Sequence, residues 1–114
     1  MLRQRGFTGS FPHFRRMGRD HVELLTFQFD RSGGGFVLEV AKCPSGGFTT
    51  YWGKTIRPQK VTAQDLHPNN RLRLGASGPG KDNWFRYDDG SSVGDVAQQL
   101  VPHLEQAEAW WRAG

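Results

Sequence analysis

Residues 21–29, HVELLTFQF, show the clearest strand pattern in the chain, with apolar residues at alternating positions. The parity of these positions changes midway, because Val22 and Leu24 share one parity while the second leucine and both phenylalanines share the other. A strand of this kind either contains a bulge or is covered on both faces. The pattern therefore predicts a strand and leaves two explanations open.

Three further segments show strand patterns. Residues 36–43, FVLEVAKC, place apolar side chains on one face and Glu39 on the other, which predicts a half-buried strand. Residues 11–17, FPHFRRM, predict an edge strand, because Pro12 cannot donate a ladder hydrogen bond. Residues 48–54, FTTYWGK, predict another strand of the same series. Regular turn spacing favours an antiparallel meander.

Residues 71–87 join an Arg-Leu alternation, RLRLG, to an aromatic run, DNWFRY, across the turn ASGPGK. Two period-2 runs on either side of a Gly/Pro-rich turn predict a β-hairpin. We expect its aromatic residues to be buried and to anchor the C-terminal helix. If Trp84 is buried, its replacement by alanine lowers the free energy of unfolding by about 3–5 kcal/mol.

The C-terminal segment has helical periodicity and begins near Ser91 or Ser92, with Asp95 in its first turn. Pro102 lies inside the pattern, so we expect a kink or a break into two helices near Val101. One apolar stripe should pack on the sheet, and it consists of Val93, Val96, Leu100, Leu104, Ala107 and Trp111. Trp110 flanks this stripe.

The ends and the middle of the chain complete the predicted fold. MLRQR with Gly6 as its cap predicts a truncated N-terminal helix, whose earlier turns would lie upstream of Met1. Residues 55–70 predict a connecting loop with one helical turn capped by Thr62. We therefore expect one α+β domain over residues 1–114, with an antiparallel meander of about five to six strands packed against a C-terminal helix.

Composition narrows the class of protein. The hydrophobic fraction of 36%, with 15 Gly and 6 Pro, is typical of a globular chain with short elements and tight turns. No apolar run approaches the roughly 20 residues that span a bilayer, and the N-terminus lacks the apolar segment of a signal peptide. The single cysteine, Cys43, cannot form an internal disulfide. We expect a cytoplasmic protein without membrane association.

Charge is distributed unevenly along the sequence, although the net charge is only +4. Residues 1–60 hold ten basic and four acidic side chains, whereas residues 61–114 hold five and seven. Five arginines precede the first acidic residue, and Arg15, Arg16 and Arg19 are the last three of them. This distribution predicts either a solvated arginine-rich surface or a basic patch for an anionic partner.

Motifs for phosphate binding, metal binding or catalysis are weak in this sequence. Gly75, Gly80 and Lys81 have the spacing of a phosphate-binding loop, but Asp82 replaces the Ser or Thr that would hold magnesium, and a strand rather than a helix should follow. The four histidines and Cys43 show no metal-ligand spacing. The Asp88-Asp89 pair fits turn chemistry before a helix. No catalytic, cofactor-binding or metal-binding residue is predicted, which argues against an enzyme.

The order of the motifs resembles one mainly bacterial family, domain of unknown function family 4304. The resemblance rests on GF near the start, F-RR a few residues on, TFQF, and the more specific pair RLRLG and DNWFRYDD before a terminal helix. Leu2, Gly6 and Phe7 match the family's Leu-x-x-x-Gly-Phe junction, and Trp84-Phe85 stands where members usually carry two tryptophans. The resemblance covers nearly the whole chain and implies an α+β fold without established catalytic residues.

Three classes of function remain open. The first is a non-enzymatic protein-binding module, of the immunity or inhibitor kind, that docks through Arg15, Arg16 and Arg19 with Trp52 as an aromatic anchor. The second is nucleic-acid binding through the N-terminal region, where Phe7, Phe11 and Phe14 lie among the arginines. The third is a small-molecule binder or enzyme with a site between the sheet and the terminal helix.

Overall fold

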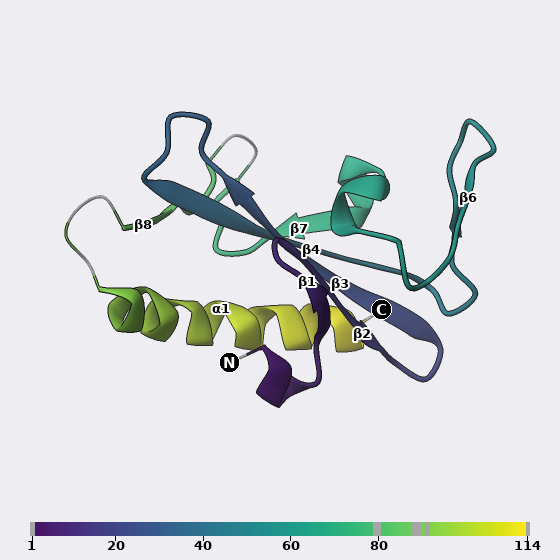
Figure 1. Cartoon of the computed structure of the whole chain (residues 1–114), viewed down its shortest axis with the longest axis horizontal. Helices are drawn as coiled ribbons and strands as arrows, with labels where there is room; N and C mark the ends of the chain where they lie inside the picture. The colour runs from purple at the N-terminus through teal and green to yellow at the C-terminus, as the bar shows by residue number, and fades with distance from the viewer. Residues whose placement is uncertain (1, 79–80, 88–89, 91, 114) are drawn as a thin grey trace. The chain divides into compact units, whose positions relative to one another are not determined.

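The computed structural model describes residues 2–78, 81–87, 90 and 92–113 of the chain. Figure 1 shows its elements coloured along the chain. The strands are β1 (Thr8–Ser10), β2 (His13–Met17), β3 (His21–Phe29), β4 (Gly35–Pro44), β5 (Phe48–Thr49), β6 (Thr55–Ile56), β7 (Arg71–Arg73) and β8 (Phe85–Arg86). The remaining elements are the 3₁₀ turns η1 (Arg3–Arg5), η2 (Ala63–Asp65) and η3 (Pro68–Asn70) and the helix α1 (Val93–Ala113).

The main sheet has the order β1-β2-β3-β4-β7, and β8 also pairs with β4. The strands β1, β2 and β3 follow one another as antiparallel neighbours. The predicted α+β class is therefore confirmed, with an antiparallel meander of about six strands and a C-terminal helix. At the N-terminus, η1 ends at Gly6, whose φ of 93° is the left-handed cap that the sequence predicted.

The register of β3 explains its change of parity. The residues of β2 and β3 pair one to one from His13 and Thr26 to Met17 and Val22, so the ladder between these two strands contains no bulge. Leu24 and Leu25 point to opposite faces, and both are fully buried. Of the two explanations left open by the sequence, coverage of both faces is the correct one.

The prediction that β4 is half-buried is wrong, because both of its faces are covered. Every residue from Gly35 to Ala41 is buried, including Glu39 at 3% exposure. The second face packs in a cluster with residues of β3 and of the segment after β6; its members are Val22, Leu24, Ala41, Cys43, Val61, Ala63 and Leu66. The sequence suggested solvent at Glu39, but an arginine supplies the compensating charge there.

The hairpin predicted for residues 71–87 does not form. Both β7 and β8 pair with β4 instead of with each other. The amide of Leu74 donates to the carbonyl of Leu38 over 2.9 Å, and Phe85 lies opposite Phe36. The intervening segment therefore leaves β4 and rejoins it two residues further along, as an insertion within one edge of the sheet.

The segment 71–87 also buries its aromatic side chains differently from the prediction. Trp84 is exposed at 36% and Tyr87 is also exposed, so the expected burial of Trp84 is wrong. Phe85 takes the anchoring role: its ring stacks on Phe36 at 5.4 Å and contacts His103 of α1 edge-on at 5.0 Å. In a short strand with alternating sides, burying Phe85 turns its two neighbours outward.

The helix α1 begins and packs as predicted but does not break. Ser92 is its N-cap: the amide of Asp95 donates to the Ser92 hydroxyl, and the Asp95 carboxylate accepts from the Ser92 amide. The helix continues through Pro102, so a break near Val101 is excluded. Because Pro102 has no amide hydrogen, the backbone carbonyl of Gln98 lacks its helical hydrogen bond. Both residues are exposed, so water can bind to this carbonyl. The side chain of Val93 lies outside the described part, and the other members of the predicted stripe are buried.

Two further strand predictions require correction. The edge strand is β1 rather than residues 11–17, because Phe11 and Pro12 form the turn before β2. Residues 48–54 do not join the meander: β5 pairs with β6 in a separate two-stranded sheet. Phe48 lies in β5, but Tyr51 and Trp52 belong to the turn between the two strands.

The contacts divide the chain into two compact units. Unit 1 comprises Met1–Thr26 and Glu39–Leu72, and unit 2 comprises Phe27–Leu38 and Arg73–Gly114. The cluster around Val22 and Leu24 is the core of unit 1. Unit 2 has an aromatic core in which Phe36 contacts the rings of Phe27, Phe29 and Phe85.

Candidate functional site

The turn between β5 and β6 exposes two large aromatic rings. Tyr51 is 96% exposed and Trp52 is 62% exposed, and their rings meet edge to face with centroids 4.8 Å apart. The amide of Gly53 donates to the carbonyl of Thr50, and the amide of Lys54 donates to the Thr50 hydroxyl. These bonds close the turn, so the rings are presented on a hydrogen-bonded loop.

A groove of about 250 Å³ lies beside this aromatic pair. Tyr51 and Trp52 line it together with Phe48 of β5 and with Leu66 and Pro68 from the segment between β6 and β7. The lining is therefore largely apolar, and the two exposed rings extend it toward solvent. A groove of this composition fits a protein side chain better than it fits a hydrophilic small molecule.

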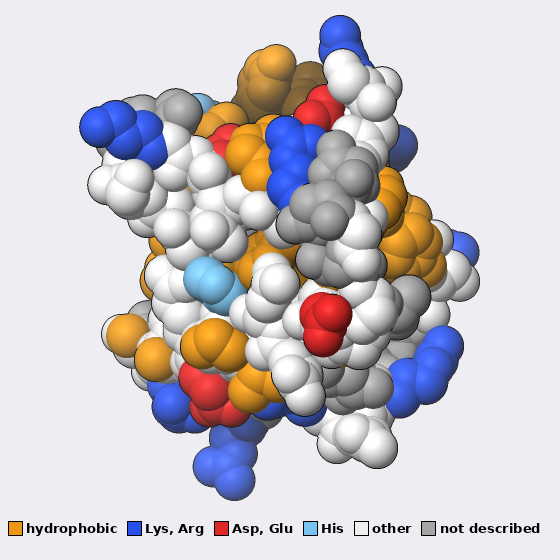
Figure 2. Space-filling view, turned by 90° about the vertical axis from the view of Figure 1, so that its left-hand side faces the viewer, with side chains coloured by type: hydrophobic (Ala, Val, Ile, Leu, Met, Phe, Trp, Pro, Cys, Tyr) orange, Lys and Arg blue, Asp and Glu red, His pale blue; other side chains and the backbone are white. Residues whose placement is uncertain are grey.

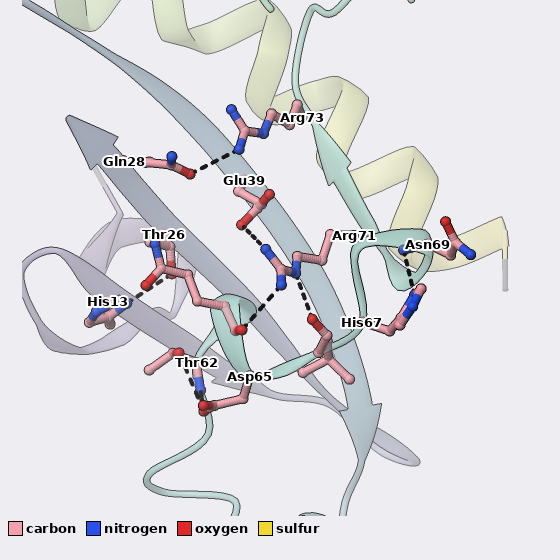
Figure 3. A network of polar contacts seen from close by, with 12 residues as sticks. His13, Thr26, Gln28, Glu39, Thr62, Asp65, His67, Asn69, Arg71 and Arg73 are labelled. Carbon is pink, nitrogen blue, oxygen red and sulfur yellow. Dashed lines mark hydrogen bonds and ion pairs between the residues drawn. The ribbon is translucent and has the colours of Figure 1, made fainter. Parts of the chain in front are cut away.

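One wall of the groove is formed by residues 64–68, and hydrogen bonds from Arg71 hold it against the sheet, as Figure 3 shows. Its Nη1 donates to the Glu39 carboxylate over 3.1 Å, and its Nε donates to the carbonyl of Leu66 over 2.7 Å. Nη2 donates to the carbonyl of Gln64 over 3.2 Å. Three bonds from one guanidinium thus hold η2 and the residue after it against β4.

The same wall is stiffened at its two turns. At η2, the amide and the hydroxyl of Thr62 both donate to the Asp65 carboxylate, over 2.8 Å and 3.3 Å. This arrangement confirms the predicted helical turn capped by Thr62. At η3, the amide of Asn69 donates to Nδ1 of His67 over 3.1 Å. The groove therefore has a wall that is largely preorganised.

Basic side chains also lie on the β5–β6 hairpin and in the segment that follows it. A cavity of about 440 Å³ is lined by Lys54, Arg57 and Lys60, and its one acidic residue, Asp65, already accepts the two bonds from Thr62. All three basic residues are exposed. We refer to Tyr51, Trp52, Lys54, Arg57 and Lys60, together with the groove, as the hairpin surface.

A family model described as Domain of unknown function (DUF4304) matches residues 1–113. The chain belongs to this family. Searches of curated proteins and of solved structures found no match. The DUF4304 assignment agrees with the resemblance seen in the sequence, and its description names no activity.

The four residues that the sequence singled out do not form one site in this DUF4304 chain. Arg15 and Arg16 are neighbours on β2, so their side chains lie on opposite faces of the sheet. Arg16 pairs with Glu23 over 2.6 Å and lies over the ring of Phe7, while Arg15 donates to the carbonyl of Val61 over 3.0 Å. Arg19 is exposed in the turn after β2, and Trp52 belongs to the hairpin surface.

The hairpin surface contains three basic residues that sequence reasoning overlooked. Lys54, Arg57 and Lys60 lie within seven positions of one another and directly follow an aromatic pair. That spacing was a usable signal, but residues 55–70 read as a plain connecting loop. The aromatic and basic side chains come from one continuous segment, residues 51–60, and the pairing of β5 with β6 folds this segment into a hairpin.

The N-terminal aromatic residues offer little for base stacking. Phe7 is buried and Phe14 is half-buried, which leaves Phe11 exposed at 60%. The arginine nearest to Phe7 is held by Glu23. On the face shown in Figure 2, acidic, basic and hydrophobic side chains are interspersed.

The remaining candidate chemistry is accounted for by local contacts. Asp82 pairs with Arg73 over 2.8 Å, and the described residues directly after Lys81 lead into β8 and not into a helix. Gly80 and the Asp88-Asp89 pair lie outside the described residues. Burial raises the pKa of the Cys43 thiol, and the charge of Asp65 raises it further, so this thiol stays protonated and unreactive.

The described residues contain neither a candidate metal site nor a helix that could span a membrane. No group of three or more His, Cys, Asp and Glu side chains there is placed to hold a metal ion. No helix in the same residues is long and apolar enough to cross a membrane.

Proposed function

We propose that this chain is a non-enzymatic binding module that captures an acidic segment of another protein on the hairpin surface. The exposed Tyr51–Trp52 pair beside an apolar groove is the observation that carries the proposal. Aromatic residues are enriched in the centres of protein interfaces, where they supply most of the binding energy. A protein segment bound over Tyr51 and Trp52 would remove their apolar surface from water, which favours binding.

The positive charge of the hairpin surface favours an acidic partner. Lys54, Arg57 and Lys60 place up to three positive charges on the hairpin surface, where Asp65 is already engaged at Thr62. An acidic segment gains electrostatic attraction there, whereas a basic one is repelled. Such a module acts by occupying its partner, which is how an immunity-like or inhibitor protein would work. The lone Cys43 thiol fits a reducing compartment, so we place this activity in the cytoplasm.

Selection from a phage library of random 12-residue peptides tests the proposal. We expect enriched peptides to combine an aromatic, leucine or proline side chain with neighbouring Asp or Glu. Because a central aromatic anchor contributes about 2 kcal/mol or more, Trp52→Ala should weaken binding of a synthetic enriched peptide about 30-fold. Fluorescence anisotropy measures this affinity.

Trp84→Ala is the matched control, since Trp84 is also partly exposed but belongs to unit 2 and is not part of the hairpin surface. It should leave peptide affinity unchanged. Equal affinity of the Trp52→Ala variant and the wild type would contradict the proposal.

Single-stranded nucleic acid is the second candidate, because bases stack on exposed aromatic rings while cations contact phosphates. The hairpin surface offers both groups. An oligo-dT probe distinguishes the candidates: binding that falls steeply with salt and is lost in Trp52→Ala, without any peptide enrichment, would favour nucleic acid.

A further inference from the structure

A second cavity in unit 1, of about 250 Å³, has a different chemical character from the groove. Its lining includes Gly9, Ser10, His13 and Arg15 from β1 and β2, and Gln59 and Lys60 from the segment after β6. None of its lining residues is acidic. The cavity therefore collects hydrogen-bond donors and positive charge from two separate parts of the chain.

Arg15 is the unusual residue of this cavity. The other arginines in the described strands each pair with a carboxylate, as Arg16 does with Glu23 and Arg71 with Glu39. Arg15 instead meets a neutral acceptor, the carbonyl of Val61. Its Nε is also the one buried side-chain nitrogen or oxygen without a hydrogen-bond partner among the described residues. A half-buried guanidinium in this situation lacks a compensating anion.

His13 and Lys60 supply further hydrogen-bond donors to this cavity. The Nδ1 atom of His13 lies 2.9 Å from the hydroxyl of Thr26, a contact that orients the ring and leaves Nε2 for another partner. Lys60 is exposed, so its ammonium group can turn toward the cavity. The hydroxyl of Ser10 and the amide of Gln59 add neutral donors.

Gly9 keeps the cavity open at its closest approach. Its φ is +117°, and a Cβ at this position would lie 2.7 Å from the carbonyl oxygen of His13 and 3.3 Å from Nη1 of Arg15. Any other residue would be strained there and would crowd the guanidinium. Glycine lets the backbone of β1 pass close to Arg15 without occupying the space beside it.

We propose that this cavity binds a phosphate group. A phosphate carries close to two negative charges and several acceptor oxygens, which match the charges of Arg15 and Lys60 and the surrounding donors. A carboxylate has two oxygens and one charge, so it would leave donors unused. The site shares Lys60 with the hairpin surface but includes neither aromatic anchor. The other residues of the cavity lie outside the hairpin surface, so variants of Arg15 and of Trp52 test the two proposals separately.

Titration with inorganic phosphate, followed by ¹H–¹⁵N NMR at constant ionic strength, tests this site. We expect saturable shifts at the amides of Ser10 and His13, with a dissociation constant in the millimolar range. Lys60→Ala should weaken binding about fivefold or more. Arg15→Lys, which keeps the charge but loses the planar fork, should also weaken it.

Lys81→Ala is the matched control, because Lys81 is an exposed lysine outside the cavity. It should not change the dissociation constant. Shifts that do not saturate, shifts reproduced by chloride, or equal effects of Lys60→Ala and Lys81→Ala would overturn the proposal. Lys60 is exposed, so its variant tests the site even where an Arg15 variant fails to fold.

A second arm with adenosine monophosphate distinguishes the sources of the phosphate. Tighter binding than inorganic phosphate, with the same loss in Lys60→Ala, would identify the group as part of a phosphate monoester. Equal binding would identify free phosphate. Peptide binding to the groove should be unchanged in the Arg15→Lys variant, because Arg15 is not part of the hairpin surface, and this separates failure of the phosphate site from failure of the proposed function.

Discussion

At the scale of single residues, Arg71 joins a buried carboxylate to the wall of the groove. The side chains of Arg71 and Glu39 are 19% and 4% exposed, so both charges are largely removed from water. Their attraction compensates for that desolvation only while both are present. The two backbone carbonyls that Arg71 also binds would lose their donors together with the ion pair.

Arg71→Met should therefore lower the free energy of unfolding by about 3–5 kcal/mol, the usual effect of leaving one partner of a buried pair alone. Urea denaturation followed by tryptophan fluorescence measures the change. Combining it with Glu39→Gln should recover part of the loss, because the orphaned charge is then removed.

Arg73→Met provides the comparison on the same strand. Arg73 pairs with Asp82, and these side chains are 31% and 24% exposed. Solvent screens such a pair, so its loss should cost about 1 kcal/mol. Equal effects of the two substitutions would show that burial of Glu39 is not what makes Arg71 important.

The same residues show where sequence reasoning reaches its limit. The alternation in residues 36–43 correctly located β4 but placed Glu39 in water, because periodicity records sidedness and not what covers each side. Trp84 was expected to be buried on account of its size, yet its neighbour Phe85 occupies the core. Which of two adjacent aromatic residues faces inward depends on strand register, and the partner strand sets that register.

At the scale of elements, local signals predicted β3 and α1 well, whereas long-range pairing escaped prediction. The capping bonds between Ser92 and Asp95 involve residues three apart, so the sequence displays them directly. The pairing of β7 and β8 with β4 joins segments about 35 to 50 residues apart. The candidate site was predicted least well, because it depends on the pairing of β5 with β6.

Pro102 makes α1 less stable than its sequence could be. A proline inside a helix removes one backbone hydrogen bond and costs about 3 kcal/mol relative to alanine. Because Pro102 is exposed, Pro102→Ala restores the bond without disturbing a packed face. We expect the free energy of unfolding to rise by about 1–3 kcal/mol, measured by thermal denaturation with circular dichroism.

Val101→Ala serves as the control for this change. Val101 is exposed next to Pro102, and alanine there alters helix propensity without adding a hydrogen bond. Its effect should remain below about 0.7 kcal/mol. Destabilisation by Pro102→Ala would show that the proline ring makes contacts that outweigh the missing bond.

At the scale of the whole molecule, charge follows the two units. Unit 1 contains ten basic and four acidic residues, and unit 2 contains five and seven. The hairpin surface and the phosphate cavity both belong to the positive unit. The uneven charge along the sequence is thus a property of a compact part of the structure, although one of the arginines predicted to carry it, Arg16, is paired with Glu23.

This distribution should steer an acidic partner. We expect the association rate of an enriched acidic peptide, measured by stopped-flow fluorescence, to fall about tenfold or more between 50 mM and 500 mM salt. Replacing Lys54, Arg57 and Lys60 together by glutamine should reduce both the rate and its dependence on salt. The dissociation rate should change less, because exposed rim charges act mainly before docking.

Arg31, Lys81 and Arg112 form a control set with the same total charge. All three are exposed and belong to unit 2. Their replacement by glutamine lowers the net charge equally but leaves the hairpin surface intact. Equal loss of association rate in the two triple variants would mean that net charge, and not its location, governs the encounter.

The insertion between β7 and β8 makes this fold a convenient carrier for foreign sequence. The chain leaves β4 at Leu74 and returns at Phe85, and the amide of Ser77 donates to the carbonyl of Lys81 over 3.1 Å, so both ends of the excursion are held by backbone bonds. Lengthening a loop whose ends are already fixed adds little closure entropy. An epitope or reporter peptide grafted into this excursion should leave the pairing of β7 and β8 with β4 unchanged.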